Sequence, residues 1–180
     1  MEISQSVTAE DLDLGPVFGE LDDDTKAKVL AELQAAEATL AKAQSELELT
    51  GEPLTVRRYP SGQSEIGSTL KGADGKLTFE ASLRPRNFFS ETPWQPGRPT
   101  RMMITDAWDV DGSVKVMVRR PVGKHKYTIE ETPEEIEEQR YESPVEAAAA
   151  LKAIAERLAT LARSREATVD AWAPPLESAG

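Results

Sequence analysis

The chain has few side chains whose type and spacing could do chemistry. It contains no cysteine, which excludes thiolate metal sites, cysteine nucleophiles and disulfides. The single histidine, His125, lies between Lys124 and Lys126, so every Ser/His/Asp scheme and every histidine-based metal site would rest on it. A histidine in a basic loop at the edge of a strand is usually solvated. We therefore expect no catalytic role for His125.

Acidic side chains are the remaining candidates for metal binding and for acid–base work. The segment Asp109-Val110-Asp111-Gly112-Ser113 alternates oxygen ligands as a calcium loop does, but the twelfth position, which needs a bidentate Glu, is Arg120. With 32 acidic residues in the chain, paired carboxylates give no specific signal for general acid–base catalysis. No glycine-rich phosphate-binding motif is present. The sequence therefore predicts no metal, no cofactor and no enzymatic activity.

The charge of the chain limits its partners. A net charge of −11 argues against direct binding to nucleic acids or anionic membranes, because both need a positively charged surface. Residues 1–5 lack the basic and apolar regions of a secretory leader, and no apolar run reaches the about 20 residues that a membrane span needs, so we expect neither a cleaved leader nor a membrane span. We expect a cytoplasmic protein, and the Ala-, Arg- and Glu-rich composition favours a bacterial or phage source.

Most of the excess negative charge lies at the start of the chain. Residues 1–25 carry eight acids and no Lys or Arg, which leaves 24 acids against 21 bases in the remainder. Spaced apolar residues are interrupted by Gly15-Pro16 and Gly19, so no single regular element fits. The composition favours a flexible acidic arm over residues 1–21. The alternative is a docking segment that folds onto a basic partner.

A long helix is predicted directly after this arm. Asp22-Asp23-Asp24 offers N-cap residues for a helix over 25–49, and Gly51 and Pro53 would end it. Leucines recur in it every seven residues, at Leu33, Leu40 and Leu47. This spacing favours packing on the protein's own sheet or on its last helix, and the alternative is a homo-oligomer or a partner helix.

A second helix is predicted near the other end of the chain. Ser143-Pro144-Val145-Glu146 is a capping box with proline at the first helical position, so an amphipathic helix is expected over 144–163 or longer. Residues 174–180, which begin with two prolines, should form a frayed tail. Residues 22–173 would then make up a single domain.

Antiparallel strands are predicted between the two helices. The Asp111-Gly112 pair between apolar runs is typical of a type I′ turn, so Arg101–Pro121 predicts a hairpin of two strands. A second hairpin is expected over Ile66–Arg84, turning around residues 73–75. Its buried face would carry Leu77, Phe79, Ala81 and Leu83. Further strands are expected at Leu54–Tyr59 and at His125–Ile129.

These patterns together predict an α+β fold. A curved antiparallel sheet of five or six strands, arranged as a hairpin meander between residues 54 and 130, would pack against the two helices. Residues 85–100 contain four prolines and three large aromatic residues, so a loop without regular structure is expected there. Residues 133–139 favour a short helix, and an edge strand through Tyr141 fits the alternation nearly as well.

The predicted central hairpin also predicts a binding surface. If Val110 faces Ser113, then Trp108 faces Lys115 on a mixed face, where the pair would form a cation–π contact. Charges are rarely buried without a partner, so we expect this face to be open, and the alternative is that the helix over 25–49 covers it. The aromatic residues of the 85–100 loop would extend the open face, or alternatively fold back to plug one end of the core. The expected partner-binding residues are Phe88, Phe89, Trp94, Trp108, Lys115 and Met117.

The absence of a catalytic constellation and the acidic charge together indicate a binding function. We expect a non-enzymatic acidic protein that recognises a basic protein partner, as inhibitors, immunity factors and assembly chaperones do. The alternative is a structural or assembly component of a bacterial or phage particle that oligomerises through its N-terminal helix.

Overall fold

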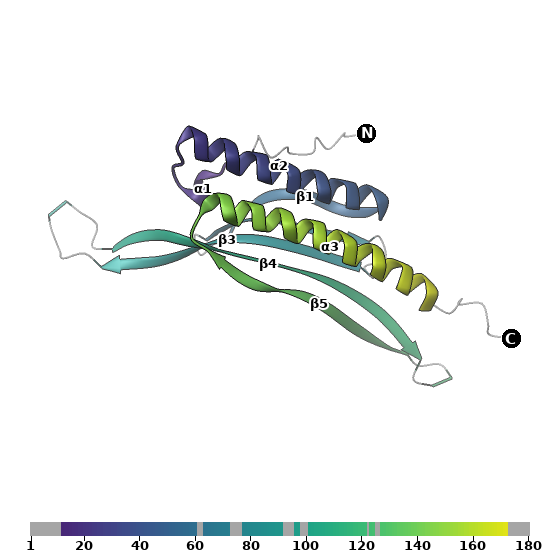
Figure 1. Ribbon diagram of the computed structural model, residues 1–180. Helices are drawn as coiled ribbons and strands as arrows, with labels where there is room; N and C mark the ends of the chain where they lie inside the picture. The colour runs from purple at the N-terminus through teal and green to yellow at the C-terminus, as the bar shows by residue number, and fades with distance from the viewer. Residues whose placement is uncertain are drawn as a thin grey trace, which may run out of the picture.

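The computed structural model describes residues 12–60, 63–72, 77–91, 96–97, 101–121, 123–124 and 127–172. Over this part of the chain the fold is α+β, as predicted: a five-stranded antiparallel sheet carries two long helices on one face (Figure 1). The predicted turn around residues 73–75, His125 and the predicted tail over 174–180 lie outside the described residues. The elements are α1 (Gly15–Phe18), α2 (Asp23–Glu46), β1 (Leu49–Arg58), β2 (Ser64–Gly72), β3 (Leu77–Glu91), β4 (Arg101–Pro121), β5 (Tyr127–Tyr141) and α3 (Pro144–Trp172).

Each strand of the sheet pairs with its neighbours in sequence, so the spatial order is β1-β2-β3-β4-β5. The predicted hairpin over Ile66–Arg84 is confirmed, because Ile66 faces Leu83 and Lys71 faces Thr78 in antiparallel register. Side chains alternate between the two faces of a strand. The predicted buried face of β3 is confirmed by the burial of Leu77, Phe79, Ala81 and Leu83.

Helix α2 begins where the aspartates predict and ends three residues early. The Asp22 carboxylate accepts a hydrogen bond of 2.8 Å from the Thr25 backbone N–H, and this bond lowers the pKa of Asp22 because it favours the charged form. The helix ends at Glu46, and Glu48, with φ of 51°, turns the chain into β1. Gly51 therefore lies in a strand instead of ending the helix.

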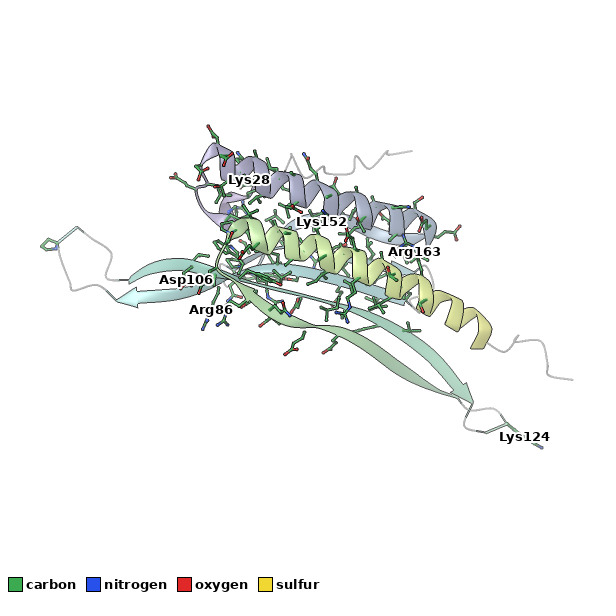
Figure 2. All side chains as sticks on the ribbon, viewed as in Figure 1. Lys28, Arg86, Asp106, Lys124, Lys152 and Arg163 are labelled. Atoms are coloured by element: carbon green, nitrogen blue, oxygen red, sulfur yellow. The ribbon has the colours of Figure 1, made fainter. Side chains whose placement is uncertain are left out.

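Helix α3 begins at Pro144, as the capping box predicts. The Ser143 hydroxyl accepts a hydrogen bond from the Glu146 N–H at 3.4 Å, and the helix continues to Trp172. Ion pairs join it to α2, with Arg163 2.7 Å from Glu46 and Lys152 3.7 Å from Glu32. Figure 2 labels Lys152 and Arg163. The leucine stripe of α2 belongs to the same core as α3 and the sheet, with Leu33, Leu40 and Leu47 exposed by 0%, 0% and 8%. The predicted intramolecular packing of this stripe is confirmed.

The predicted turn at Asp111-Gly112 is wrong, because β4 is one strand of 21 residues. Gly112 pairs with Ala81 of β3 on one side and with Ile136 of β5 on the other. A Cβ atom on Gly112 would lie 2.7 Å from Leu158 Cδ1 and 2.8 Å from Ile154 Cγ2. The glycine lets α3 approach the sheet closely, which explains its position in mid-strand.

The expected loop over residues 85–100 is also corrected in part. Residues 85–91 continue β3 and pair with β4, from Pro85 opposite Trp108 to Glu91 opposite Arg101. Pro85 lies beyond the last β2–β3 pair, at Leu83, where β3 has a neighbour on one side only. Strands accept proline in such an edge setting. The β3–β4 and β4–β5 hairpins extend from the sheet in opposite directions (Figure 1).

The short helix expected over residues 133–139 is wrong, and the alternative of an edge strand is confirmed. Strand β5 pairs with β4 from Tyr127 to Tyr141, with a register shift opposite Val110 and Gly112. Ile136, the only large apolar residue of that segment, packs against the core. Pairing along β4 satisfies more backbone groups than an isolated helical turn would, which explains the outcome.

Candidate functional site

Trp108, the centre of the predicted partner-binding surface, is buried beneath α1. Its indole N–H donates a hydrogen bond of 2.8 Å to the Val17 carbonyl oxygen, and its ring centroid lies 5.7 Å from that of Phe18. Only 6% of Trp108 is exposed. The expected open face around Trp108 is therefore wrong, and this residue belongs to the core.

The covering segment is part of the arm that was expected to be flexible. Leu14, Val17 and Phe18 are exposed by only 5%, 1% and 6%, so residues 12–21 pack on the domain. An ion pair of 2.9 Å between Asp13 and Arg58 adds to this docking. The flexible-arm prediction is wrong for residues 12–21, and its part over residues 1–11 lies outside the described residues. Apolar burial outweighed the negative charge of this segment.

The structure does not gather the other predicted site residues into one patch. Lys115 is half-buried on the opposite face of β4 from Trp108, about 23 Å along the same strand, so the expected cation–π contact does not form. Met117 pairs with Glu131 in the β4–β5 hairpin. Phe88 and Phe89 lie in the hairpin at the other end of β4. Trp94 lies outside the described residues.

The face of the sheet away from α2 and α3, here called the open face, carries a polar network instead. At its centre the Glu65 carboxylate is only 5% exposed and accepts three hydrogen bonds. The donors are Arg57 at 3.3 Å, Ser82 at 2.8 Å and the Tyr59 hydroxyl. Donation to Glu65 raises the pKa of Tyr59, because the phenolate form would lose this bond and meet the carboxylate charge.

Arg84 continues the network toward the far edge of the sheet. Its guanidinium lies 2.7 Å from Asp111 of β4 and 2.5 Å from Glu138 of β5, and it reaches Ser82 at 3.5 Å. Burial lowers the pKa of Arg84, but hydrogen bonds and charge from Asp111 and Glu138 outweigh this and raise it overall. Side chains from all five strands are thus linked across the open face.

A hollow of about 620 Å³ lies over this network. Two guanidinium groups line it, those of Arg57 and Arg84. Six carboxylates line it as well: Glu65, Glu80, Asp111, Glu135, Glu137 and Glu138. Four negative charges are therefore left without a matching guanidinium. Such a surface suits hydrogen bonding to ammonium or guanidinium groups of a partner.

Hydrogen bonds link the side chains that line the hollow. Its acidic residues accept them from arginine, serine and tyrosine side chains. Within the described residues, no group of three potential ligands that could hold a metal ion occurs. None of the helices in the same part of the chain is long and apolar enough to cross a membrane.

A sequence signal for this network existed but was incomplete. The predicted buried face of Leu77, Phe79, Ala81 and Leu83 implies that Ser82 and Arg84, which alternate with these residues, lie on the other face of β3, as they do. Their contacts with Glu65 and Asp111 depend on the register of strands far apart in sequence. The turn that the sequence predicts at Asp111 is incompatible with that register.

Comparison with known proteins gives no match: no family model fits this sequence, and neither a curated protein nor a solved structure matches it.

Proposed function

We propose that this protein is a non-enzymatic acidic binding protein that recognises a basic protein partner, in the manner of an inhibitor, immunity factor or assembly chaperone. The observation that carries the proposal is the hollow of the open face, where six carboxylates meet two guanidinium groups. A cytoplasmic site of action is part of the proposal and accords with the absence of cysteine.

Two features of the open face support recognition of a protein. The Glu65 and Arg84 networks hold side chains from five strands in place before any partner arrives, which reduces the entropy lost on binding. The exposed Glu80 and Glu135 lie on either side of Ser113 in neighbouring strands. The net charge of −11 would speed association with a basic protein through electrostatic steering.

The test is quantitative binding to purified basic proteins that the immobilised protein captures. The double variant Glu80→Gln and Glu135→Gln removes two exposed charges from the open face and leaves the hydrogen bonds of Glu65 and Arg84 intact. We expect at least a tenfold loss of affinity, which corresponds to about 1.4 kcal/mol. The matched control, Glu20→Gln with Glu156→Gln, removes two exposed charges that do not line the hollow and should keep the affinity.

If both double variants lost affinity equally, the affinity would depend on net charge alone, which would contradict recognition by the open face. Failure to capture any basic protein at low ionic strength would contradict the proposed function itself. The alternative of an assembly component that oligomerises through α2 has no exposed leucine stripe to support it, because Leu33, Leu40 and Leu47 are buried within the chain.

A further inference from the structure

Charge is segregated along the β4–β5 hairpin. From Ser113 to Ile129 the sequence has five basic residues and no acidic one, whereas Glu130 to Glu138 holds six glutamates. The two strands pair out to Pro121 opposite Tyr127, so the backbone carries Arg119 and Arg120 to the far part of the hairpin. Lys124 is exposed at its tip (Figure 2). The three basic residues Arg119, Arg120 and Lys124 are here called the basic tip.

The open face offers a surface of opposite charge. Glu80, Ser113 and Glu135 form a row across β3, β4 and β5, and both glutamates are exposed. Neither glutamate forms an ion pair with another described residue. They line the hollow together with four further carboxylates and two guanidinium groups. Both long helices lie on the other face, and no described helix covers this one (Figure 1).

The basic tip cannot reach the open face of its own chain. Arg119 follows Ser113 by six residues of continuous strand, a distance of about 20 Å at the rise of an extended chain. A paired strand cannot fold back over its own sheet without a turn, and none interrupts β4 between these residues. Contact between the two surfaces must therefore form between molecules.

We propose that the basic tip of the β4–β5 hairpin docks on the open face of a second copy of this chain. Arg119, Arg120 and Lys124 would donate to the carboxylates around Glu80 and Glu135. The proposal does not rest on the function proposed above, because it needs no other protein. A basic partner and the basic tip would compete for the same carboxylates, so self-association would restrict access to the open face until such a partner displaces the tip.

The test begins with sedimentation of the purified protein at low and high salt. Self-association is expected at about 0.01 M salt, where the Debye length is about 30 Å, and its loss at about 1 M salt, where that length is about 3 Å. Reversing the tip with Arg119→Glu and Arg120→Glu should abolish it, and so should reversing the face with Glu80→Lys and Glu135→Lys. An equimolar mixture of the two double variants should associate again, because each then supplies what the other lacks.

The matched control reverses two charges on the helical layer, Lys28→Glu with Lys42→Glu, whose side chains are 62% and 71% exposed. It should still associate. Circular dichroism and thermal unfolding check that each variant is folded. A measurement without substitutions comes from zero-length carbodiimide coupling of the wild-type protein, where an intermolecular amide between Lys124 and an open-face carboxylate is expected.

A protein that stays monomeric at low salt and yields no such amide overturns the proposal. Association that survives reversal of the tip also overturns it. Capture of a basic protein by a strictly monomeric chain would leave the proposed function standing and this inference refuted, so the two fail separately.

Discussion

The two faces of the same five-stranded sheet differ in burial and in polarity. Under the helices, alternate residues such as Phe79 and Val114 are fully buried in one apolar core. On the open face, their sequence neighbours are in polar surroundings: Ser113 lines the hollow with carboxylates and guanidinium groups, and Thr78 pairs with Lys71 and Lys115 of the adjacent strands. One strand supplies both faces because successive side chains point in opposite directions. The covered face therefore forms the apolar core, and the open face carries the polar network.

The comparison predicts a large difference between adjacent residues of β3. Phe79→Ala removes a fully buried ring and leaves a cavity, so we expect a loss of about 3–5 kcal/mol in the free energy of unfolding. Thr78→Ala, on the open face, should change it by less than about 0.5 kcal/mol. Urea unfolding followed by circular dichroism measures both. Similar losses in the two variants would contradict the division of the sheet into two faces.

Trp108 extends the comparison to the place where α1 covers the sheet. Trp108→Ala should cost about 3–5 kcal/mol of unfolding free energy, because it removes a buried indole and the bond to the Val17 carbonyl. Hydrogen exchange should also show weaker protection of Gly19, whose backbone N–H closes α1 on Gly15. Near-native stability of Trp108→Ala would contradict the burial of Trp108 and support the exposed position that the sequence predicts.

Gly112 tests how closely α3 lies on the covered face. Gly112→Ala places a Cβ atom 2.7 Å from Leu158 Cδ1 and 3.0 Å from the Glu80 carbonyl oxygen, so we expect a loss of about 1–3 kcal/mol. Gly123→Ala is the matched control, since its Cβ would meet no atom within 4 Å. Thermal unfolding measures the stability of both variants. A neutral Gly112→Ala would show that α3 moves away easily.

Glu65 tests whether the open face contributes to stability at all. Glu65→Ala leaves Arg57, Tyr59 and Ser82 without a shared acceptor, and we expect a loss of about 1–3 kcal/mol. Glu80→Ala, an exposed neighbour on the same face, should fall within about 0.5 kcal/mol. Chemical unfolding measures the difference. An unchanged free energy of unfolding in Glu65→Ala would show that the network does not stabilise the fold.

The smallest expected effect concerns alkaline pH. The folded pKa of Tyr59 is raised above its ordinary value by the bond to Glu65, so the stabilisation is complete below pH 10. It is lost as the pH rises through the folded pKa, where the phenol ionises. Ultraviolet titration should show a tyrosine ionisation above pH 10 that Tyr59→Phe removes. A titration curve whose high-pH step is unchanged in Tyr59→Phe would contradict the hydrogen bond.

Much of the fold was predictable because its signals are local. The aspartates before α2, the capping box before α3 and the alternation of Leu77 to Leu83 each specify an element through residues within one or two turns or along one strand. The Asp111-Gly112 pair failed for the converse reason. Two neighbouring strands and an overlying helix set its conformation, and all three are distant in sequence.

The candidate site was less predictable than the fold. The predicted turn at Asp111-Gly112 makes Lys115 a cross-strand neighbour of Trp108. In the structure the two residues lie on opposite faces of one strand. The docking of Phe18 on Trp108 is a tertiary contact that composition alone could not reveal. The Glu65 network needed the register of β1, β2 and β3 together, which no single segment encodes.

The pairing of α2 with α3 has a consequence for folding during synthesis on the ribosome. The ion pair between Arg163 and Glu46 joins residues 117 positions apart, with the entire sheet between them in sequence. On the ribosome, α2 and all five strands emerge before α3 does, so the leucines of α2 stay incompletely covered throughout that interval. Nascent chains with exposed apolar faces associate readily. The excess of acidic residues in the early part of the chain would keep neighbouring nascent molecules apart until the last helix closes the core.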